Sequence, residues 1–146
     1  MQYKVVLVLG SKSDEDHAKK ITSKLSEFGI ASEIHVCSAH KSTPKLLSLI
    51  QFHDASANHV VYVAVAGRSN ALGGVLDGNT LNPVINCPPV SEKFAGLDLL
   101  SSLRMPSNMA VTTILEPENA ALACVKLFAF HDKELRAKLD AYRKSL

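Results

Sequence analysis

The sequence predicts an α/β fold, a three-layer sandwich in which a five-stranded parallel sheet lies between two layers of helices. Short β-rich runs alternate along the chain with longer stretches of helical periodicity, which is typical of βαβ units. These runs are apolar at successive positions, as in strands that are buried on both faces. The 146 residues are 47% hydrophobic and suffice for one domain, so we expect a single domain over residues 1–146.

The chain opens with a strand, a helix and a second strand. Residues 5–9 are a continuous apolar run and form the first expected strand. Between residues 16 and 28, apolar side chains recur at helical spacing, and Gly29 follows where a helix commonly ends. Residues 33–37 are the second expected strand.

The middle of the chain continues this alternation. Thr43 is suited to cap a helix and Pro44 to occupy its first position, and the pattern extends to about residue 52. Residues 60–66 are the third and most apolar strand. Residues 83–87 are a short fourth strand. If it runs parallel to the third strand, the chain between them must cross over the sheet.

The C-terminal third completes the sheet and adds helices. A helix is expected at about residues 95–103, and the fifth strand at residues 109–115. Pro117 opens a helix that is apolar on nearly every face over residues 120–130. The tail, residues 131–146, has an amphipathic stripe made of Leu135, Leu139, Tyr142 and Leu146. With right-handed crossovers, this order predicts a flavodoxin-like sheet plus a C-terminal helix.

Charge and cysteine content exclude several classes of protein. The net charge is only +2 and the basic residues are scattered, so no nucleic-acid partner is expected. The three cysteines form no C-x-x-C pair, which argues against a disulfide framework and for a reducing compartment. The N-terminus has no charged leader with an apolar core, and the apolar runs are too short to span a bilayer. We therefore expect a soluble, cytoplasmic protein without a membrane partner.

The most unusual residues follow the expected strands. Ligands of open parallel sheets bind outside the carboxyl ends of the strands. The segments concerned are residues 10–14, 38–41, 66–74 and 87–89. Because all four would meet at one edge of the sheet, an active site is the favoured interpretation.

The first of these loops has the composition of an anion site. Gly10 permits a tight turn, Ser11 and Ser13 offer hydroxyl groups, and a helix N-terminus follows. The loop is not a P-loop, because the G-K-[ST] ending is absent. Asp14 would repel a phosphate and suits a sugar hydroxyl. The alternative is that Ser13 or Asp14 only caps the helix.

His40 is the candidate acid–base residue of the second loop. Ser38 and Lys41 place a hydroxyl and a cation beside it for an anionic substrate. The alternative is a merely structural or exposed histidine. The histidines without such neighbours, to which we assign no role, are His17, His35, His53, His59 and His131.

The third loop combines Arg68 with three glycines, which permit close approach of backbone to a ligand. A glycine-rich turn with Arg68 in a surface ion pair is the alternative.

Taken together, these loops resemble the phosphoribosylaminoimidazole carboxylase family over nearly the whole chain. Any one motif is weak, but five in order are specific. The motifs are Gly-Ser-Lys-Ser-Asp at 10–14, Ser-Ala-His-Lys at 38–41, Ala-Gly-Arg-Ser-Asn at 66–70, Asn-Cys-Pro-Pro at 86–89 and Ser-Ser-Leu-Arg-Met-Pro-Ser at 101–107.

The resembled family has two classes, which act on different substrates in purine biosynthesis. Class I moves a carboxyl group of the N5-carboxylated ribonucleotide to C4, whereas class II attaches CO2 to C4 of 5-aminoimidazole ribonucleotide (AIR). Class I commonly has arginine at position 41, small residues at 68–70, histidine at 71 and glutamine at 104. The residues found here are Lys41, Arg68-Ser69-Asn70, Ala71 and Arg104. These departures point to class II, as in the carboxylase domain of the animal bifunctional enzyme.

The resemblance also implies roles for individual residues. His40 would move the C4 proton, as a histidine can near neutral pH. The phosphate would be bound by Ser11, Ser13, Ser38 and Lys41, and the ribose by Asp14. CO2 and the new carboxylate would be bound by Gly67, Arg68, Ser69 and Asn70.

No metal, organic cofactor or ATP is implied, because the enamine-like C4 is nucleophilic and CO2 is electrophilic. Relatives form homo-octamers, so we expect one here, with the tail from about residue 131 in subunit contacts. The alternatives are the class I mutase reaction and a non-catalytic nucleotide-binding module.

Overall fold

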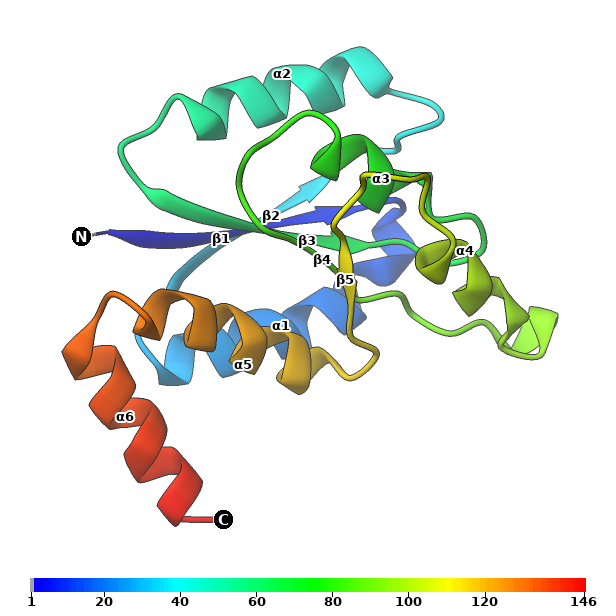
Figure 1. Cartoon of the computed structure of the whole chain (residues 1–146). Coiled ribbons are helices and arrows are strands. Elements are labelled where there is room, and N and C mark those ends of the chain that lie inside the picture. Colours follow the sequence, from blue (N-terminus) through cyan, green and yellow to red (C-terminus); the bar gives the residue numbers. More distant parts are fainter. Residues whose placement is uncertain (1) are drawn as a thin grey trace.

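The computed structural model, which describes residues 2–146, confirms the predicted architecture: a five-stranded, all-parallel sheet with helices on both sides (Figure 1). The strands lie in the order β2-β1-β3-β4-β5. They are β1 (Tyr3–Leu9), β2 (Ala31–Val36), β3 (His59–Val65), β4 (Val84–Asn86) and β5 (Thr112–Thr113). The α-helices are α1 (Glu15–Glu27), α2 (Thr43–Asp54), α3 (Ala71–Asp77), α4 (Leu100–Leu103), α5 (Pro117–Ala129) and α6 (Lys133–Lys144).

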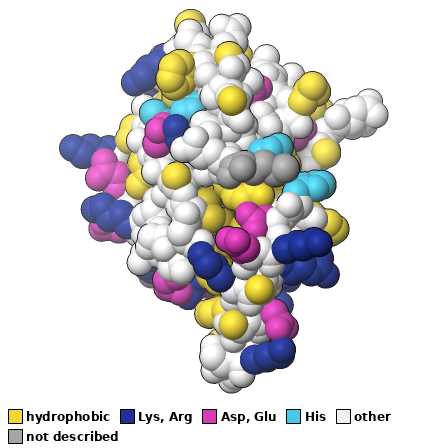
Figure 2. Space-filling model, turned by 90° about the vertical axis from the view of Figure 1, so that its left-hand side faces the viewer, with side chains coloured by type: hydrophobic (Ala, Val, Ile, Leu, Met, Phe, Trp, Pro, Cys, Tyr) yellow, Lys and Arg dark blue, Asp and Glu magenta, His cyan; other side chains and the backbone are white. Residues whose placement is uncertain are grey.

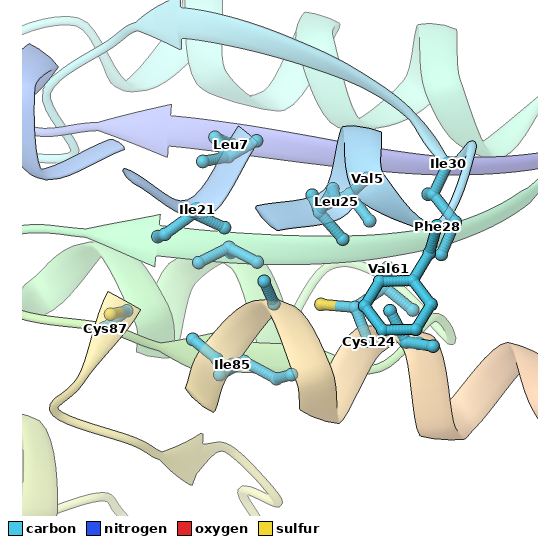
Figure 3. Close-up of a cluster of buried hydrophobic side chains, with 14 of the residues drawn as sticks. Val5, Leu7, Ile21, Leu25, Phe28, Ile30, Val61, Ile85, Cys87 and Cys124 are labelled. Atoms are coloured by element: carbon cyan, nitrogen blue, oxygen red, sulfur yellow. The ribbon is translucent and has the colours of Figure 1, made fainter. Parts of the chain in front are cut away.

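The sheet separates two apolar layers. Val5 and Leu7 of β1 project to the side of α1 and α5, where they pack with residues such as Ile21 and Cys124 (Figure 3). The alternate β1 residues, Val6 and Val8, project to the opposite side and pack under α2 and α3. Burial on both faces accounts for the continuous apolar runs of β1 and β3.

Strand register brings three loops to one level. Leu9, the last residue of β1, pairs with Val36 of β2 and with Val65 of β3. The loops that follow these three strands therefore start side by side at the carboxyl edge of the sheet. Because α1 returns on one side of the sheet and α3 on the other, the loops after β1 and β3 diverge and leave a crevice between them.

Several predicted boundaries were wrong. Residues 71–77 form α3, although the pair Gly73-Gly74 was taken as part of a loop. Residues 92–103 form two 3₁₀ turns and the single-turn helix α4 instead of one helix. The fifth strand is confined to Thr112–Thr113. Tertiary packing and backbone turns decide these segments, whose periodicity is weak.

The tail helix packs within the chain. Leu135 of α6 is buried in the cluster formed with α1 and α5, and Leu139 and Tyr142 pack against that cluster. The Tyr142 ring lies 5.5 Å from the Phe28 ring in an edge-on arrangement. The outermost residue of the predicted stripe, Leu146, is 82% exposed.

The surface near the chain termini carries charges of both signs. In Figure 2, basic and acidic side chains lie next to one another over this face rather than in one basic field. Within residues 2–146, no helix is long and apolar enough to cross a membrane.

Candidate functional site

A pocket of about 340 Å³ lies at the carboxyl edge of the sheet, within the range of roughly 300–1,000 Å³ that is usual for small-molecule sites. The loops after β1, β2 and β3 form its walls. Its lining residues are Gly10, Ser11, Ser13, Asp14, Ser38, Ala39, His40, Lys41, Ala66, Gly67, Arg68, Ser69 and Leu72. Every residue predicted for the site except Asn70 therefore lines one pocket.

The first loop is held by the hydroxyl group of Ser11. Its oxygen accepts hydrogen bonds from the backbone N–H of Ser13 at 3.3 Å and from the Ser13 hydroxyl at 3.0 Å. These bonds close the short 3₁₀ turn Lys12–Asp14 that precedes α1. Asp14 occupies the N-cap position of α1, but its side chain makes no capping hydrogen bond. The Asp14 carboxylate is therefore available to a ligand in the pocket.

The second loop is a tight turn that presents His40 and Lys41. The Ser38 carbonyl accepts from the backbone N–H of Ser42 at 3.0 Å, and the Ser38 hydroxyl accepts from the backbone N–H of Lys41 at 3.3 Å. Ser42 occupies the N-cap position of α2 without a side-chain capping bond, so the helix begins at Thr43, one position earlier than expected. The hydrogen bonds of the turn are made within the loop, so the side chains of His40 and Lys41 are not needed for them. Both side chains are exposed and can reach a substrate.

The third loop has a left-handed residue at Arg68, with φ at 58°. Such a conformation is uncommon for a residue other than glycine and persists only when neighbouring contacts fix it. The Asp98 carboxylate supplies one such contact by accepting from the backbone N–H of Arg68 at 2.9 Å. At Gly67, a Cβ atom would lie 2.9 Å from the carbonyl oxygen of Pro89. The loop is thus braced against residues 89–98.

Asn70 does not line the pocket, in contrast to its predicted placement beside the carboxylate. Its side chain is 3% exposed and caps α3 by accepting from the backbone N–H of Gly73 at 3.1 Å. Its amide nitrogen donates to the Ser102 hydroxyl at 2.9 Å. The helix at residues 71–77, which was not predicted, needs this cap and so turns Asn70 inward.

The charges of the pocket favour an anion that carries hydroxyl groups. Lys41 and Arg68 bring two cations to its walls, and the serines bring hydroxyl donors. Partial burial raises the pKa of Asp14 above its ordinary value, while the Ser11 backbone and the nearby Arg68 act in the opposite direction.

The side chains that could share a metal ion lie elsewhere. Among the residues that the structure describes, one group of three histidine, cysteine or acidic side chains lies close enough to share an ion, and none of its members lines this pocket.

Sequence reasoning missed the residues that brace the third loop from residues 98–102. Besides the Asp98 carboxylate, the Ser101 hydroxyl accepts from the backbone N–H of Asn70 at 2.9 Å. Ser101 and Ser102 belong to a motif used for the resemblance, which was the available indication. Their partners could not be named because the contacts span about thirty residues of sequence.

The fold and the pocket together define a doubly wound α/β protein with a polar pocket of small-molecule size at the point where the strand order reverses. A family model described as AIR carboxylase matches residues 4–146. The chain therefore belongs to the AIR carboxylase family, a family of enzymes of purine biosynthesis. This assignment confirms the resemblance seen in the motifs.

Individual relatives agree with this assignment. The chain is 49% identical to a phosphoribosylaminoimidazole carboxylase of Archaeoglobus fulgidus, over 97% of this chain and 78% of that protein. It is 42% identical to the bifunctional phosphoribosylaminoimidazole carboxylase/succinocarboxamide synthetase of Rattus norvegicus, over 96% of this chain and 33% of that protein. The crystal structure of Treponema denticola PurE superimposes with a TM-score of 0.96 at 42% identity, and the match covers 99% of this chain and 91% of that one.

Proposed function

We propose that the chain carboxylates AIR at C4 with CO2 to give 4-carboxy-5-aminoimidazole ribonucleotide. The observation that carries this proposal is the convergence of His40, the serine hydroxyls and the Arg68-Ser69 segment on one pocket. A carboxylation of this kind needs a proton acceptor, a phosphate site and a cation for the new carboxylate. Each of these chemical groups lines the pocket.

The substrate would lie with its phosphate at the hydroxyls of Ser11, Ser13 and Ser38 and at the Lys41 ammonium group. The Asp14 carboxylate, which caps no helix, would accept from the ribose hydroxyls. This arrangement fixes the imidazole ring over the third loop. Holding two reactants in line can supply roughly 7–11 kcal/mol of a barrier, so positioning is the main contribution of the pocket.

The chemical step forms one C–C bond and removes one proton. Electrons of the enamine-like ring attack the carbon of CO2 from C4, and the C–O π electrons move onto oxygen. The C4 hydrogen then leaves as a proton to His40, which restores the aromatic ring. Proton transfer to a positioned base typically contributes about 10²–10⁴-fold. The step uses only AIR, CO2 and a proton acceptor, and it consumes no ATP.

Arg68 and Ser69 favour CO2 over the N5-carboxylated ribonucleotide as the carboxyl source. Free CO2 is small and must be captured together with the charge that forms on its oxygens. The exposed Arg68 guanidinium group and the Ser69 hydroxyl offer that capture at the pocket wall. Asn70 would contribute by capping α3 and thereby fixing the loop. The free thiols Cys37, Cys87 and Cys124 suit a reducing compartment, so we place the reaction in the cytoplasm.

The test is a comparison of two ribonucleotides under matched conditions. Purified protein is supplied with AIR plus bicarbonate and carbonic anhydrase, or with N5-carboxy-AIR in buffer freed of CO2, and formation of the C4-carboxylated product is measured. We expect turnover of AIR that depends on bicarbonate and does not respond to ATP. Product formation only from N5-carboxy-AIR would assign the mutase reaction instead. Nucleotide binding without product from either substrate would overturn the enzymatic proposal.

A further inference from the structure

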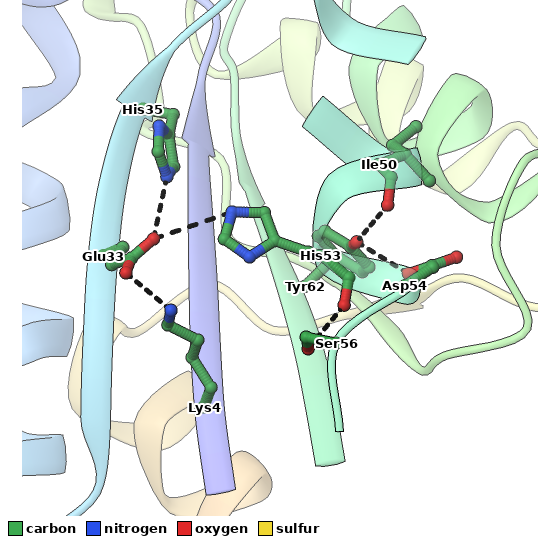
Figure 4. Close-up of polar contacts among 8 residues, drawn as sticks. All are labelled: Lys4, Glu33, His35, Ile50, His53, Asp54, Ser56 and Tyr62. Atoms are coloured by element: carbon green, nitrogen blue, oxygen red, sulfur yellow. Dashed lines mark hydrogen bonds and ion pairs between the residues drawn. The ribbon is translucent and has the colours of Figure 1, made fainter. Parts of the chain in front are cut away.

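A second cluster of chemically active side chains lies on the outer part of the sheet, under the end of α2. Glu33 and His35 are two residues apart on β2, so their side chains project from the same face. His53 comes from the last turn of α2, which covers that face. Figure 4 shows both imidazole rings turned toward the Glu33 carboxylate.

The donor atoms of this cluster converge on one point. The His35 Nε2 atom lies 3.2 Å from Glu33 Oε2, and the His53 Nε2 atom lies 3.6 Å from the same oxygen. The ligand atoms of the three residues all lie within 4.8 Å of one another. Donor atoms at about 2.0–2.1 Å from a tetrahedral zinc ion are about 3.3–3.4 Å apart, and the two separations from Glu33 Oε2 lie within a few tenths of an ångström of that value.

His53 supports a ligand role on independent grounds. Its side chain is 1% exposed, yet its Nε2 atom makes no hydrogen bond and has only the longer contact to Glu33. Buried polar atoms are normally hydrogen-bonded, so one that lacks a partner and faces two further ligand atoms needs an explanation. A bound cation would satisfy it.

Lys4 prepares the carboxylate without blocking it. Its ammonium group lies 2.6 Å from Glu33 Oε1, whereas both imidazoles face Oε2. The ion pair at Oε1 fixes the orientation of the carboxylate and leaves Oε2 for another ligand. His53 also lies in the last turn of α2, where the negative end of the helix dipole favours a cation.

We propose that Glu33, His35 and His53 form a binding site for a zinc-class divalent cation that joins the edge strand β2 to the end of α2. Two imidazole nitrogens and one carboxylate oxygen are a usual ligand set for zinc with a further position open to water. Glu33 and His35 are partly exposed, with side-chain accessibilities of 42% and 34%, so the ion has a path from solvent. The site shares no residue with the pocket at the carboxyl edge, and its role is structural.

The test is metal binding by the full-length, tag-free chain after treatment with a chelator. Titration with Co²⁺ is followed by visible absorption, because low-symmetry four-coordinate Co²⁺ absorbs far more strongly than the hexaaqua ion. Competition with Zn²⁺ then gives the affinity for zinc. We expect one equivalent per chain, and loss of affinity in Glu33→Gln and His35→Gln that exceeds the roughly 10- to 100-fold effect of removing an outer-sphere partner.

Two further variants make the outcome unambiguous. His53→Gln tests the buried ligand, and His35→Gln at the partly exposed strand serves if that variant does not fold. His131→Gln, an exposed histidine outside the cluster, is the matched control and should bind like the parent chain. Zinc should raise the thermal midpoint of the parent and the control but not of His35→Gln. Equal zinc affinity in His35→Gln and the parent, or a Co²⁺ spectrum of the hexaaqua type, would overturn the proposal.

Discussion

The carboxylate of Asp98 holds the backbone N–H of Arg68 at 2.9 Å, across thirty residues of sequence. The bond fixes Arg68 in a left-handed conformation whose strain is about 1–3 kcal/mol. The cation that faces the pocket is therefore positioned by a residue outside the pocket lining.

Asp98→Ala should loosen the third loop without touching the phosphate end of the pocket. The carboxylate accepts from the backbone N–H groups of Arg68 and, at 3.4 Å, of Ser91. Loss of the bond to Arg68 removes about 0.5–1.5 kcal/mol, so the bicarbonate requirement should rise by roughly two- to tenfold. Affinity for AIR should stay within about twofold. Asp98→Asn retains an acceptor oxygen and should restore part of the effect. An unchanged bicarbonate requirement in Asp98→Ala, measured by steady-state kinetics, would show that the bond does not position Arg68.

His40→Asn should abolish turnover while AIR affinity stays within about tenfold, because only the proton step is removed. Calorimetric titration with AIR and the coupled assay measure the two quantities separately. His131→Gln is the control, since this histidine is exposed and far along the chain from the pocket loops. Near-normal turnover of His40→Asn would remove His40 from the proposed role.

Two adjacent glycines of α3 should respond oppositely to the same substitution. A Cβ atom at Gly73 would overlap Oδ1 of the buried Asn86, whereas a Cβ atom at Gly74 would have Met105 Sδ as its nearest neighbour, at an ordinary contact distance of 3.5 Å. Gly73→Ala should cost about 1–3 kcal/mol or more through overpacking. Gly74→Ala should be neutral or stabilise the helix by up to about 1 kcal/mol. Thermal midpoints at one scan rate test this, and equal midpoints would contradict it.

Stability should fall on acidification in part through His17. Its half-buried imidazole lies 3.5 Å from the Cys87 thiol, and burial, with a smaller effect of Lys20, lowers its pKa below 6.5. The unfolded chain therefore takes up the proton first, so folding free energy is lost as the pH falls below about 6.5.

His17→Gln should flatten this dependence between about pH 7.5 and about pH 5.5 in urea unfolding, with His131→Gln as the control. An identical loss of stability in the parent and in His17→Gln would assign the acid sensitivity to other groups.

The chain should assemble, and we predict a homo-octamer. A groove of about 550 Å³ beside β4, β5 and α5 is lined largely by apolar side chains, among them Leu81 at 104% exposure and Phe130 at 77%. Association would remove such surfaces from water, and closed symmetric assemblies are the usual solution. Light scattering should give a mass about eight times 15.7 kDa. A fully active monomer would contradict this, and Phe130→Ser should weaken assembly.

The sequence predicted the sheet because β1 is apolar at every position from Val5 to Leu9 and β3 at every position from Val60 to Val65, as in strands buried on both faces. It predicted the pocket loops because parallel strands end at one edge. It failed where a local pattern has two meanings. The pair Gly73-Gly74 is typical of a loop, yet Gly73 is required for contact between α3 and Asn86. Asn70 has a suitable side chain for an anion but serves as the cap of that helix.

The cation cluster could not be predicted from spacing alone. Glu33 and His35 share a face of β2, but His53 joins them only because α2 crosses back over the sheet. The pair Glu33 and His35 supplies only two of the three ligands. The crossover of α2 brings His53 to this face, and the register between β1 and β2 places Lys4 beside the cluster as well.

The anchoring of Gly67 and Asn70 has a consequence for how this pocket can change over time. Gly67 lies close to the Pro89 carbonyl, and Asn70 is buried and hydrogen-bonded to α4. The side chains of Arg68 and Ser69 between them are exposed and do not pack in the core. Substitutions at Ser69, and at Arg68 by residues that tolerate its left-handed backbone, therefore cost little folding energy. A lineage could exchange one source of the carboxyl group for another at these two positions and inherit the rest of the pocket intact.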